Sequence, residues 1–482
     1  MSKILTLDLG TTYFKFALFG RSGRLCQVTQ SATPVRQSQY GRLELEVSGF
    51  KQGLAEGIAR LGLEAGGLND VDQVTYATQA NSFLLLGAND APLTPIILWP
   101  DRRAASGGEM ERTLCCLPHF VVTTGVPAAS LESMAAKLLW FRRQEPRIWE
   151  QARRICLMDE YLVLLFTGQH VMEAGAAGLT GLMDIRRGTW WLEALSKMQL
   201  DPCALPAVAR AGTDLGPLQP WVAATFGLPP TCRFVVGSLD QYAGAIGRGN
   251  VSPGKVSETT GTVLATVRYA DHLAEGRGSQ VFQGPGPVNG HYYQMAFGNV
   301  SANYLEWYRR WLPDCPGFDE MAALAEGIEP GAGGLRLNTS RPPTVPAEVF
   351  EGLTSGHTSG HAIRCILEAV AWALQDQVLA LCSGVPPTEV RAGGGGARSP
   401  LWLQIKADVL GVPLTPCQCP DAASLGAAIL AEAARTGASV SQVAQTWVKL
   451  GNPYLPDSKR HRFYKMLSQV TPGRQIAGTA SA

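Results

Sequence analysis

Short apolar runs separated by polar turns open the chain, and their spacing predicts β-hairpins. Residues 4–7 form an apolar strand that runs directly into Asp8, and a second apolar run follows at 13–19. The turn between them is Gly10-Thr11-Thr12, and another turn leads to a third run at 25–29. Short runs bounded by glycine and polar residues are typical of strands. We therefore predict three consecutive strands at the start of the chain.

A similar pattern recurs in the second half of the chain. Residues 256–263 alternate like a strand, are broken by Thr260-Gly261-Thr262, and give way to an apolar run at 263–267. Backbone N–H groups and hydroxyls in a Gly-Thr turn are the donors that a phosphate chain needs. Two strand–turn–strand units of this kind predict a duplicated fold with one phosphate-binding turn in each half.

Elsewhere the hydrophobic pattern switches between the periods of helices and of strands. The predicted helices cover residues 50–61, 133–141, 159–166, 302–311, 361–381 and 422–434. The further predicted strands cover residues 71–77, 96–98, 234–236 and 292–297, and one more ends at Val390. The alternation indicates an α/β fold. Because residues 422–434 are mostly small, we expect another element to pack tightly on that helix.

Residues 235–263 carry the strongest chemical signal. Asp240 follows an apolar run and a Gly-Ser turn, and open α/β sheets place their chemistry at the carboxyl ends of buried strands. The small residues that follow, spaced by glycines as far as Gly249, suit either close helix packing or a hinge. An acid at 240 and a phosphate-binding turn at 260–262 together indicate phosphoryl transfer.

Two polar clusters follow other predicted strands. Residues 79–82, Gln-Ala-Asn-Ser, follow the strand at 71–77, and residues 99–103, Trp-Pro-Asp-Arg-Arg, follow the strand at 96–98. A flat apolar face beside fixed donors and acceptors suits a sugar. A surface turn with solvated charges and an inward-facing Trp99 accounts for the second cluster equally well.

A glycine loop lies near the end of the chain. Residues 393–396 are all glycine, and Ser399-Pro400 fits a helix N-cap followed by a first-turn proline. Glycines before a helix N-terminus allow the backbone to approach a flat or anionic ligand. The order strand, glycines, capped helix favours nucleotide binding over a merely flexible loop.

Length and composition restrict the class of protein. The chain has 482 residues, which predicts more than one domain, with 46% hydrophobic and 17% charged residues. A net charge of +1 offers no basic surface for nucleic acid or for a membrane. The eleven cysteines form no CxxC pair, the first residues are too briefly apolar for a signal peptide, and no stretch reaches membrane-spanning length. We expect a cytoplasmic enzyme.

These motifs, in this order, resemble the FGGY carbohydrate kinases, which have the two-domain actin-like and Hsp70-like ATPase (ribonuclease H-like) fold. The resemblance covers residues 4–434. The matching elements are DLGTT at 8–12, WPDRR at 99–103, GSLDQ at 237–241, TTGT at 259–262, GLTSGHTSGHAIRCILE at 352–368, GGGARSPLW at 394–402 and SLGAAILA at 424–431. Within the family the chain looks most like the xylulokinase group.

The resemblance implies an active site in the interdomain cleft, with ATP and Mg²⁺ as cofactors. Asp240 would be the general base, and Asp8 would hold magnesium through water. ATP and its phosphates would lie against Gly10, Thr11, Thr12, Thr260, Gly261, Thr262, Gly395, Gly396, Ala397 and Ser399. The sugar would lie against Gln79, Asn81, Trp99, Asp101, Arg103, Asp240 and Gln241.

The expected domains are an N-terminal sugar and phosphate domain at 1–245, a C-terminal nucleotide domain at 246–437, and a helical segment with a frayed tail at 438–482. The expected partners are a small sugar, ATP and, in a homodimer, a second copy, but neither nucleic acid nor a membrane. A five-carbon ketose such as D-xylulose is the expected substrate. Another ketose or a polyol such as ribulose, ribitol or glycerol remains an alternative.

The chain departs from the xylulokinase group at residues 79–82, where that group carries Gln-Met-His-Gly, and at residues 339–343, where the family carries Gly-Glu-Arg-x-Pro. These departures bear on the identity of the sugar. Two other classes remain open: a nucleotide-binding regulatory relative without turnover, and a chaperone-type or filament ATPase of the same fold. A silent relative would be expected to lack Asp8 or Asp240, and both are present.

Overall fold

A computed structural model describes residues 2–37, 41–104, 108–128, 130, 132–274, 281–339 and 343–469. The chain forms two units, each assembled from separate segments. The first contains Met1–Val251, Ala270–Tyr293 and Asp421–Val448, and the second contains Ser252–Tyr269, Gln294–Pro420 and Lys449–Ala482. The predicted frayed tail from residue 472 and most of the altered 339–343 element lie outside the described residues. The domain boundaries at 245 and 437 stay a prediction.

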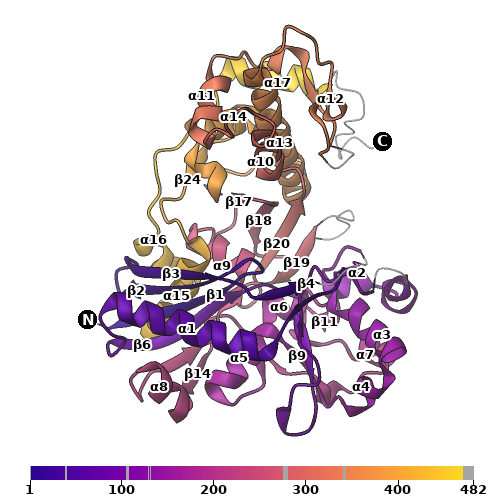
Figure 1. Ribbon diagram of the computed structural model, residues 1–482, viewed down its shortest axis with the longest axis vertical. Coiled ribbons are helices and arrows are strands. Elements are labelled where there is room, and N and C mark those ends of the chain that lie inside the picture. The colour runs from indigo at the N-terminus through magenta and orange to yellow at the C-terminus, as the bar shows by residue number, and fades with distance from the viewer. Residues whose placement is uncertain are drawn as a thin grey trace. The chain divides into compact units, whose positions relative to one another are not determined.

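The first unit is built on a mixed sheet with the strand order β14-β15-β6-β1-β2-β3, and β16 also pairs with β6 (Figure 1). Its strands are β1 (Lys3–Leu9), β2 (Tyr13–Gly20), β3 (Leu25–Ala32), β6 (Val71–Thr78), β14 (Asp214–Pro217), β15 (Arg233–Val235) and β16 (Ser238–Leu239). A second sheet has the order β4-β5-β8-β7-β9 and comprises β4 (Val35–Gln37), β5 (Leu43–Leu45), β7 (Phe83–Leu86), β8 (Ile96–Ile97) and β9 (Arg154–Leu157). The three predicted N-terminal strands are confirmed. β2 pairs antiparallel with β1 on one side and with β3 on the other.

Helices cover both faces of the first sheet. Because side chains alternate along a strand, Leu5 and Leu7 of β1 join the core beneath α1 (Val47–Ala65) and α5 (Met158–Thr167). On the other face, Gln73 of β6 donates to the carbonyl of Ala431 in α15 (Ala422–Thr436). Gly57 allows α1 to pack closely on the sheet, because a Cβ at this position would lie only 2.0 Å from the ring of Phe16 in β2.

Helix α9 (Asp240–Gly247) packs against α15 with almost no side chain between the two backbones. A Cβ on Gly247 would lie 1.8 Å from the carbonyl oxygen of Ala422, and a Cβ on Gly426 would lie 1.8 Å from that of Ala243. The tight packing predicted for the small-residue helix is therefore confirmed. A hinge at the glycines after Asp240 stays a prediction.

We expect Gly426→Ala to destabilise the protein by about 1–3 kcal/mol or more, because the added methyl group must push α9 and α15 apart. Urea unfolding measures this change. Gly327→Ala is the matched control, since a Cβ at that position meets nothing within 4 Å. Equal stability of the Gly426 variant and the control would contradict the direct backbone contact.

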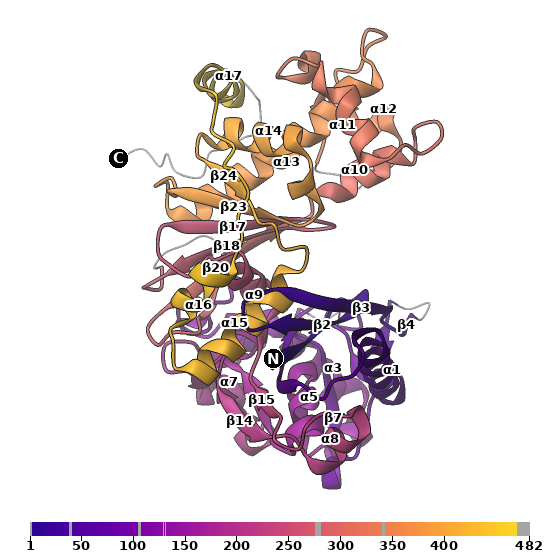
Figure 2. The ribbon, with the colours of Figure 1, turned by 90° about the vertical axis from the view of Figure 1, so that its left-hand side faces the viewer.

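The second unit carries the other predicted hairpin. Five strands of a six-stranded sheet follow one another in the order β20-β18-β17-β23-β24. They are β20 (Tyr292–Gly298), β18 (Leu264–Ala270), β17 (Lys255–Thr260), β23 (Glu389–Gly393) and β24 (Leu414–Pro416). Figure 2 shows α13 (Ser359–Cys382) and α14 (Pro400–Leu410) on one side of this sheet. The smaller helices include α10 (Ala302–Arg309), α11 (Phe318–Glu326) and α17 (Ser458–Gln469).

Helix α13 has the apolar face predicted for it. Ile363, Ile366, Leu367, Val370, Leu374 and Val378 are all buried. The expectation that no stretch reaches membrane-spanning length was wrong for this helix: among the described residues it is the one helix that is long and apolar enough to cross a membrane, and 56% of that stretch is buried inside the protein. Burial of this extent is what the core helix of a folded unit shows.

Candidate active site

The strand register of the first unit brings three predicted segments to one edge of the sheet. Leu9 of β1 and Leu239 of β16 both lie beside Thr78 of β6 in parallel register. The residues that follow these strand ends are therefore neighbours: the Gly10–Thr12 turn, Gln79 and Asp240. This is the carboxyl edge at which an α/β sheet presents its functional groups.

Asp8 lies at this edge in an ion pair. Antiparallel register places Lys15 of β2 opposite Asp8, and their Nζ and Oδ2 atoms are 3.2 Å apart. Asp421, which precedes α15, contributes a second carboxylate 4.0 Å from the same ammonium. The pKa of Asp8 is raised to about 6, chiefly because the carboxyl is buried. The charge of Lys15 opposes this rise, and the charge of Asp421 adds to it. Burial lowers the pKa of Lys15, but the charges of Asp8 and Asp421 outweigh burial, so the pKa of Lys15 is raised overall.

Asp240 is the first residue of α9. The residue is partly exposed, and its Oδ1 accepts the N–H of Gln241 at 2.6 Å. Burial raises the pKa of Asp240 to about 7, and the charge of Asp8 adds to this rise, whereas the Gln241 N–H and the charge of Lys15 oppose it. A carboxyl with a pKa near 7 is well suited to accept a proton at neutral pH.

Hydrogen bonds join the first Gly-Thr turn to both predicted sugar clusters. The Thr11 hydroxyl donates to Oε1 of Gln79 at 2.9 Å and accepts from Nε1 of Trp99 at 2.9 Å. Ser82 also donates to Oε1 of Gln79 and accepts the backbone N–H of Trp99. The structure thus brings Thr11, Gln79 and Trp99 together. The Thr11 hydroxyl holds the indole of Trp99 through its N–H edge.

Asp101 and Arg103 are bonded chiefly to each other. The two oxygens of Asp101 accept two bonds from the guanidinium, at 2.8 and 2.9 Å, together with the N–H groups of Leu43 and Arg103. Arg103 also pairs with Glu44 at 2.6 Å, and its side chain is 3% exposed. This arrangement favours holding the loop that carries Trp99; direct sugar contact by the pair stays a prediction.

Asn81 is likewise bonded within the protein. Its Oδ1 accepts the N–H of Met134, which begins α3 (Met134–Gln144), and its Nδ2 donates to the carbonyl of Leu179. Its φ of 61° lies in the left-handed region, which asparagine adopts more readily than most residues. Contact of Asn81 and Gln241 with a sugar stays a prediction.

In the second unit, the glycine loop packs on the second Gly-Thr turn. β17 and β23 are parallel, with Thr259 beside Gly393. A Cβ on Gly396 would lie 2.8 Å from Cβ of Thr260, so only glycine permits this approach. Gly261 and Thr262 are partly or fully exposed at the tip of the turn, as is Gly395 in the loop. The two predicted nucleotide segments therefore lie together within this unit.

The helix after the glycine loop begins as predicted. The Ser399 hydroxyl accepts the N–H of Trp402 as an N-cap, and Pro400 occupies the first turn of α14. Ala397 precedes this cap in a short 3₁₀ turn, Gly395–Arg398. The predicted strand–glycines–capped-helix order is confirmed, and adenosine binding there stays a prediction.

The Thr260 hydroxyl is already engaged in a buried polar triad. It donates to Oε2 of Glu258 at 2.7 Å and accepts from Nζ of Lys406 at 2.6 Å, and the side chains of Glu258 and Lys406 are 0% exposed. Thr260 is the last residue of β17, one residue before the turn, and its hydroxyl is already bonded, so it is less available to a phosphate than its predicted place in the turn implied. Because Thr260 directly precedes the Gly261–Val263 turn, the triad fixes the start of that turn.

Asp8 fits the binding of magnesium. Within the described ranges, no group of three or more His, Cys, Asp or Glu side chains is arranged to hold a metal. Magnesium typically uses one or two carboxylates and completes its shell with water and substrate phosphates. The carboxylate of Asp8, beside a Gly-Thr turn and near Asp421, matches that mode.

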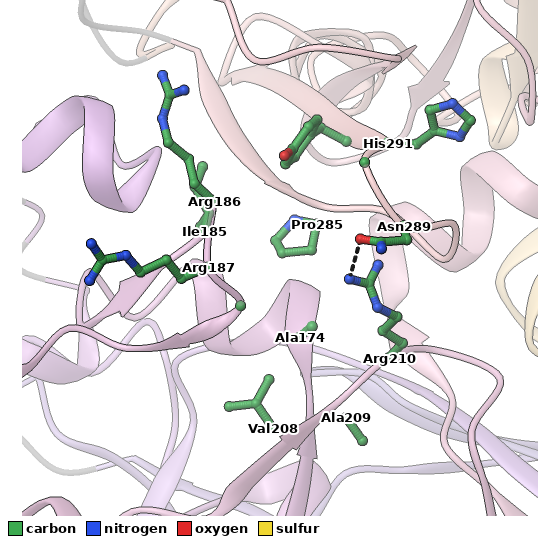
Figure 3. A pocket seen from close by; sticks show the side chains of 13 residues that line it. Ala174, Ile185, Arg186, Arg187, Val208, Ala209, Arg210, Pro285, Asn289 and His291 are labelled. Carbon is green, nitrogen blue, oxygen red and sulfur yellow. Dashed lines mark hydrogen bonds between the residues drawn. The ribbon is translucent and has the colours of Figure 1, made fainter.

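A separate cavity of about 120 Å³ lies beside α6 (Ala174–Gly178) in the first unit. Its lining includes Ala174 and Pro285, and Arg210 donates to Asn289 at one side at 2.7 Å (Figure 3). Arg186 and Arg187 extend away from its centre (Figure 3). No residue predicted for the sugar or the nucleotide lines this cavity.

The sequence reasoning missed several residues of the site. The turn predicted at 10–12 would pair Asp8 with Phe14, whereas the observed register pairs Leu9 with Phe14 and therefore Asp8 with Lys15, so Lys15 could have been found only with a four-residue turn at 10–13. A glutamate in a predicted strand, such as Glu258, needs a cationic partner if it is buried. The sequence around Glu258 does not identify that partner as Lys406, which lies 148 positions away. Asp421 likewise reaches the site only through the tertiary fold.

Comparison with known proteins decides the family. The model of the N-terminal domain of the FGGY family of carbohydrate kinases matches residues 3–247, which is half of the chain, and the model of the C-terminal domain matches residues 334–435. The chain belongs to the FGGY family of carbohydrate kinases. It is therefore a sugar kinase with the two-domain actin-like fold, as the resemblance implied.

Individual relatives of this FGGY kinase differ in their named substrates. It is 26% identical to the xylulose kinase of Bacillus subtilis (97% of this chain, 95% of the relative) and 25% identical to the gluconokinase of Bacillus licheniformis (89% and 87%). The ligand-bound xylulose kinase structure from Lactobacillus acidophilus superposes with a TM-score of 0.88 at 22% identity, covering 97% of this chain and 96% of that one. The last comparison shows the fold alone.

Proposed function

We propose that this FGGY kinase transfers the γ-phosphoryl group of ATP to a hydroxyl of a pentulose, most favourably D-xylulose, giving xylulose 5-phosphate. The observation that carries the proposal is the carboxylate of Asp240, whose pKa is raised to about 7 at the edge where β1, β6 and β16 end. Phosphoryl transfer needs positioned groups and little covalent chemistry from the protein.

In the proposed reaction, Asp240 accepts the proton of the attacking sugar hydroxyl. The Gly10–Thr12 and Gly261–Val263 turns offer backbone N–H groups to the phosphates, and the loop at Gly395–Ala397 lies against the adenosine. Asp8 and bound water would hold Mg²⁺, which neutralises phosphate charge when bound. Lys15 lowers the pKa of Asp8 and of Asp240 and so favours the charged form of both carboxylates.

A ketose is favoured over gluconate because the buried or paired cations around Trp99 are already bonded within the protein. A carboxylate substrate is best recognised by a cation that can reach it. Arg103 is committed to Asp101 and Glu44, and Lys15 to Asp8. Lys137 is 0% exposed and donates to the carbonyls of Leu98, Trp99 and Glu132. A neutral polyhydroxylated substrate therefore needs no change in the pairing of these three cations, whereas a carboxylate substrate would have to rely on Arg102, the exposed arginine of the 99–103 cluster.

The substrate assignment is tested by kcat/KM across D-xylulose, L-xylulose, D-ribulose, L-ribulose, ribitol, glycerol and D-gluconate. We expect D-xylulose to lead, because a site built to bond a particular hydroxyl rejects analogues that lack it, by roughly 10⁴ in favourable cases. Glycerol or gluconate as the best substrate, or no turnover of any pentulose, would overturn the pentulose proposal and leave the family assignment intact.

The raised pKa of Asp240 predicts the pH profile. The base acts only as a carboxylate, so kcat/KM should fall as the pH drops below about 7, by about tenfold per pH unit. Lys15→Met removes an ammonium that lowers the pKa of Asp240 and Asp8. The acid limb of this variant should therefore move to higher pH, and an unmoved or lowered limb would show that Lys15 does not act on the base.

We also propose a cytoplasmic location for this sugar kinase. All eleven cysteines lie in the described part of the chain and are free thiols. Free thiols suit a reducing compartment.

A further inference from the structure

Glu173 is a buried carboxylate that joins two distant parts of the first unit. It ends β10 (Val171–Glu173), is the N-cap of α6, and is 2% exposed. Its Oε1 accepts the N–H of Gly175 at 2.7 Å, and its Oε2 accepts that of Ala176 at 2.9 Å. These two bonds cap α6, a role that Asp, Asn, Ser and Thr fill more often than Glu. The same Oε2 also accepts the N–H of Leu239, 66 positions away, at 3.2 Å.

Leu239 is the point at which the chain turns from β16 into α9. It is the N-cap residue of α9, has φ −48° and ψ 134°, and offers no side-chain cap of its own. The next residue is Asp240. A bond to the N–H of Leu239 therefore fixes the peptide immediately before the residue that carries the proposed base.

Packing holds the same two elements together. A Cβ on Gly175 of α6 would lie 2.8 Å from the ring of Tyr242, which belongs to α9 and is 1% exposed. The hydroxyl of Tyr242 would lie 2.8 Å from a Cβ on Gly284. The start of α9 is thus confined sterically by α6 and bonded to the α6 cap.

The position of Glu173 is itself determined by its neighbours. Its backbone N–H donates to Oδ2 of the buried Asp159 at 3.2 Å. Burying a carboxylate without partners is costly, and three N–H donors offset that cost. A side chain held at its backbone and at both oxygens is well suited to hold another group in place.

We propose that Glu173 is a positioning residue for the phosphoryl-transfer reaction, acting through the N–H of Leu239 to orient the carboxylate of Asp240. The inference rests on the proposed role of Asp240 as the base. Displacing a reacting group by about 1 Å can lower a rate by about 10²-fold. Glu173 makes no contact with the substrate in this scheme.

The variant that isolates this role is Glu173→Asp. Aspartate is a good helix N-cap, so it keeps the cap of α6, but it is one methylene shorter and withdraws the carboxylate from Leu239. Glu173→Gln is the second variant, because its amide keeps one acceptor and places N–H groups against N–H donors. We expect either variant to lower kcat/KM by on the order of 10- to 100-fold.

The matched control is Glu160→Gln. Glu160 is a Glu of the same unit that is 1% exposed, accepts the backbone N–H of Leu157 at the start of α5, and contacts the ring of His170 through its other oxygen. It does not bond to Leu239. We expect Glu160→Gln to change kcat/KM little, even where it lowers stability as much as the Glu173 variants do.

A double-mutant cycle with Asp240→Asn, made in the full chain, separates positioning from general damage. If Glu173 acts through Asp240, the Glu173 variants should lower the residual kcat/KM of Asp240→Asn by about twofold or less, since the two changes remove one function. The same 10- to 100-fold loss in both backgrounds, or no loss with Asp240 intact, would overturn the positioning role. Near-wild-type turnover of Asp240→Asn alone would instead overturn the role of the base.

Discussion

Asp240→Asn should lower turnover by on the order of 10²–10⁴-fold while ATP still binds and the protein still folds. Asparagine keeps the shape of the side chain and its place at the start of α9, but it cannot take the proton of the attacking hydroxyl. The loss should appear in kcat at saturating sugar and ATP, measured by coupled ADP release.

Asp214→Asn is the control for the loss of one carboxylate from the first unit. Asp214 pairs with Arg233 at the surface, where ion pairs contribute little, so near-wild-type kinetics are expected. Turnover of Asp240→Asn close to that of Asp214→Asn would remove Asp240 from the mechanism.

Lys406→Met should destabilise the protein by about 3–5 kcal/mol, the effect expected when one partner of a buried ion pair is removed. The change leaves the Glu258 carboxylate without its ammonium, 2.7 Å away in the wild type, and releases the Thr260 hydroxyl. Because the triad anchors the Gly261–Val263 turn, the KM for ATP should also rise. Urea unfolding and ATP kinetics measure the two effects.

Lys3→Met is the matched control for the removal of a lysine. Lys3 pairs with Asp70 at the surface, and such pairs contribute about 1 kcal/mol or less. Adding Glu258→Leu to Lys406→Met should recover much of the stability, since replacing both partners removes the uncompensated charge. A stability of Lys406→Met equal to that of Lys3→Met would contradict the anchoring role of the triad.

Local sequence signals predicted the elements that position the site. The turns at Gly10–Thr12 and Gly261–Val263 are flanked by antiparallel strands, as the apolar runs indicated, although the second turn lies one residue later than the predicted 260–262. Gly437 ends α15 in the left-handed conformation. Each of these features depends on residues within a few positions of one another, which is why periodicity and capping rules were enough.

The contacts between distant segments could not be predicted in the same way. Trp99 was expected to offer a flat face to a sugar, but the sequence gives no sign that its indole N–H bonds to Thr11, 88 positions away. Glu173 looks like any strand-end acid until the fold places it beneath Leu239. Such pairings depend on strand order and helix packing, which single residues do not specify.

The most direct test follows the phosphoryl group itself by ³¹P NMR, with ATP, Mg²⁺ and D-xylulose present. The account predicts that the γ-phosphate signal is replaced by a phosphate monoester signal of the sugar, at matching rates in wild type and Asp214→Asn and far more slowly in Asp240→Asn. Release of inorganic phosphate alone, or formation of the sugar phosphate at an equal rate in Asp240→Asn, would contradict it.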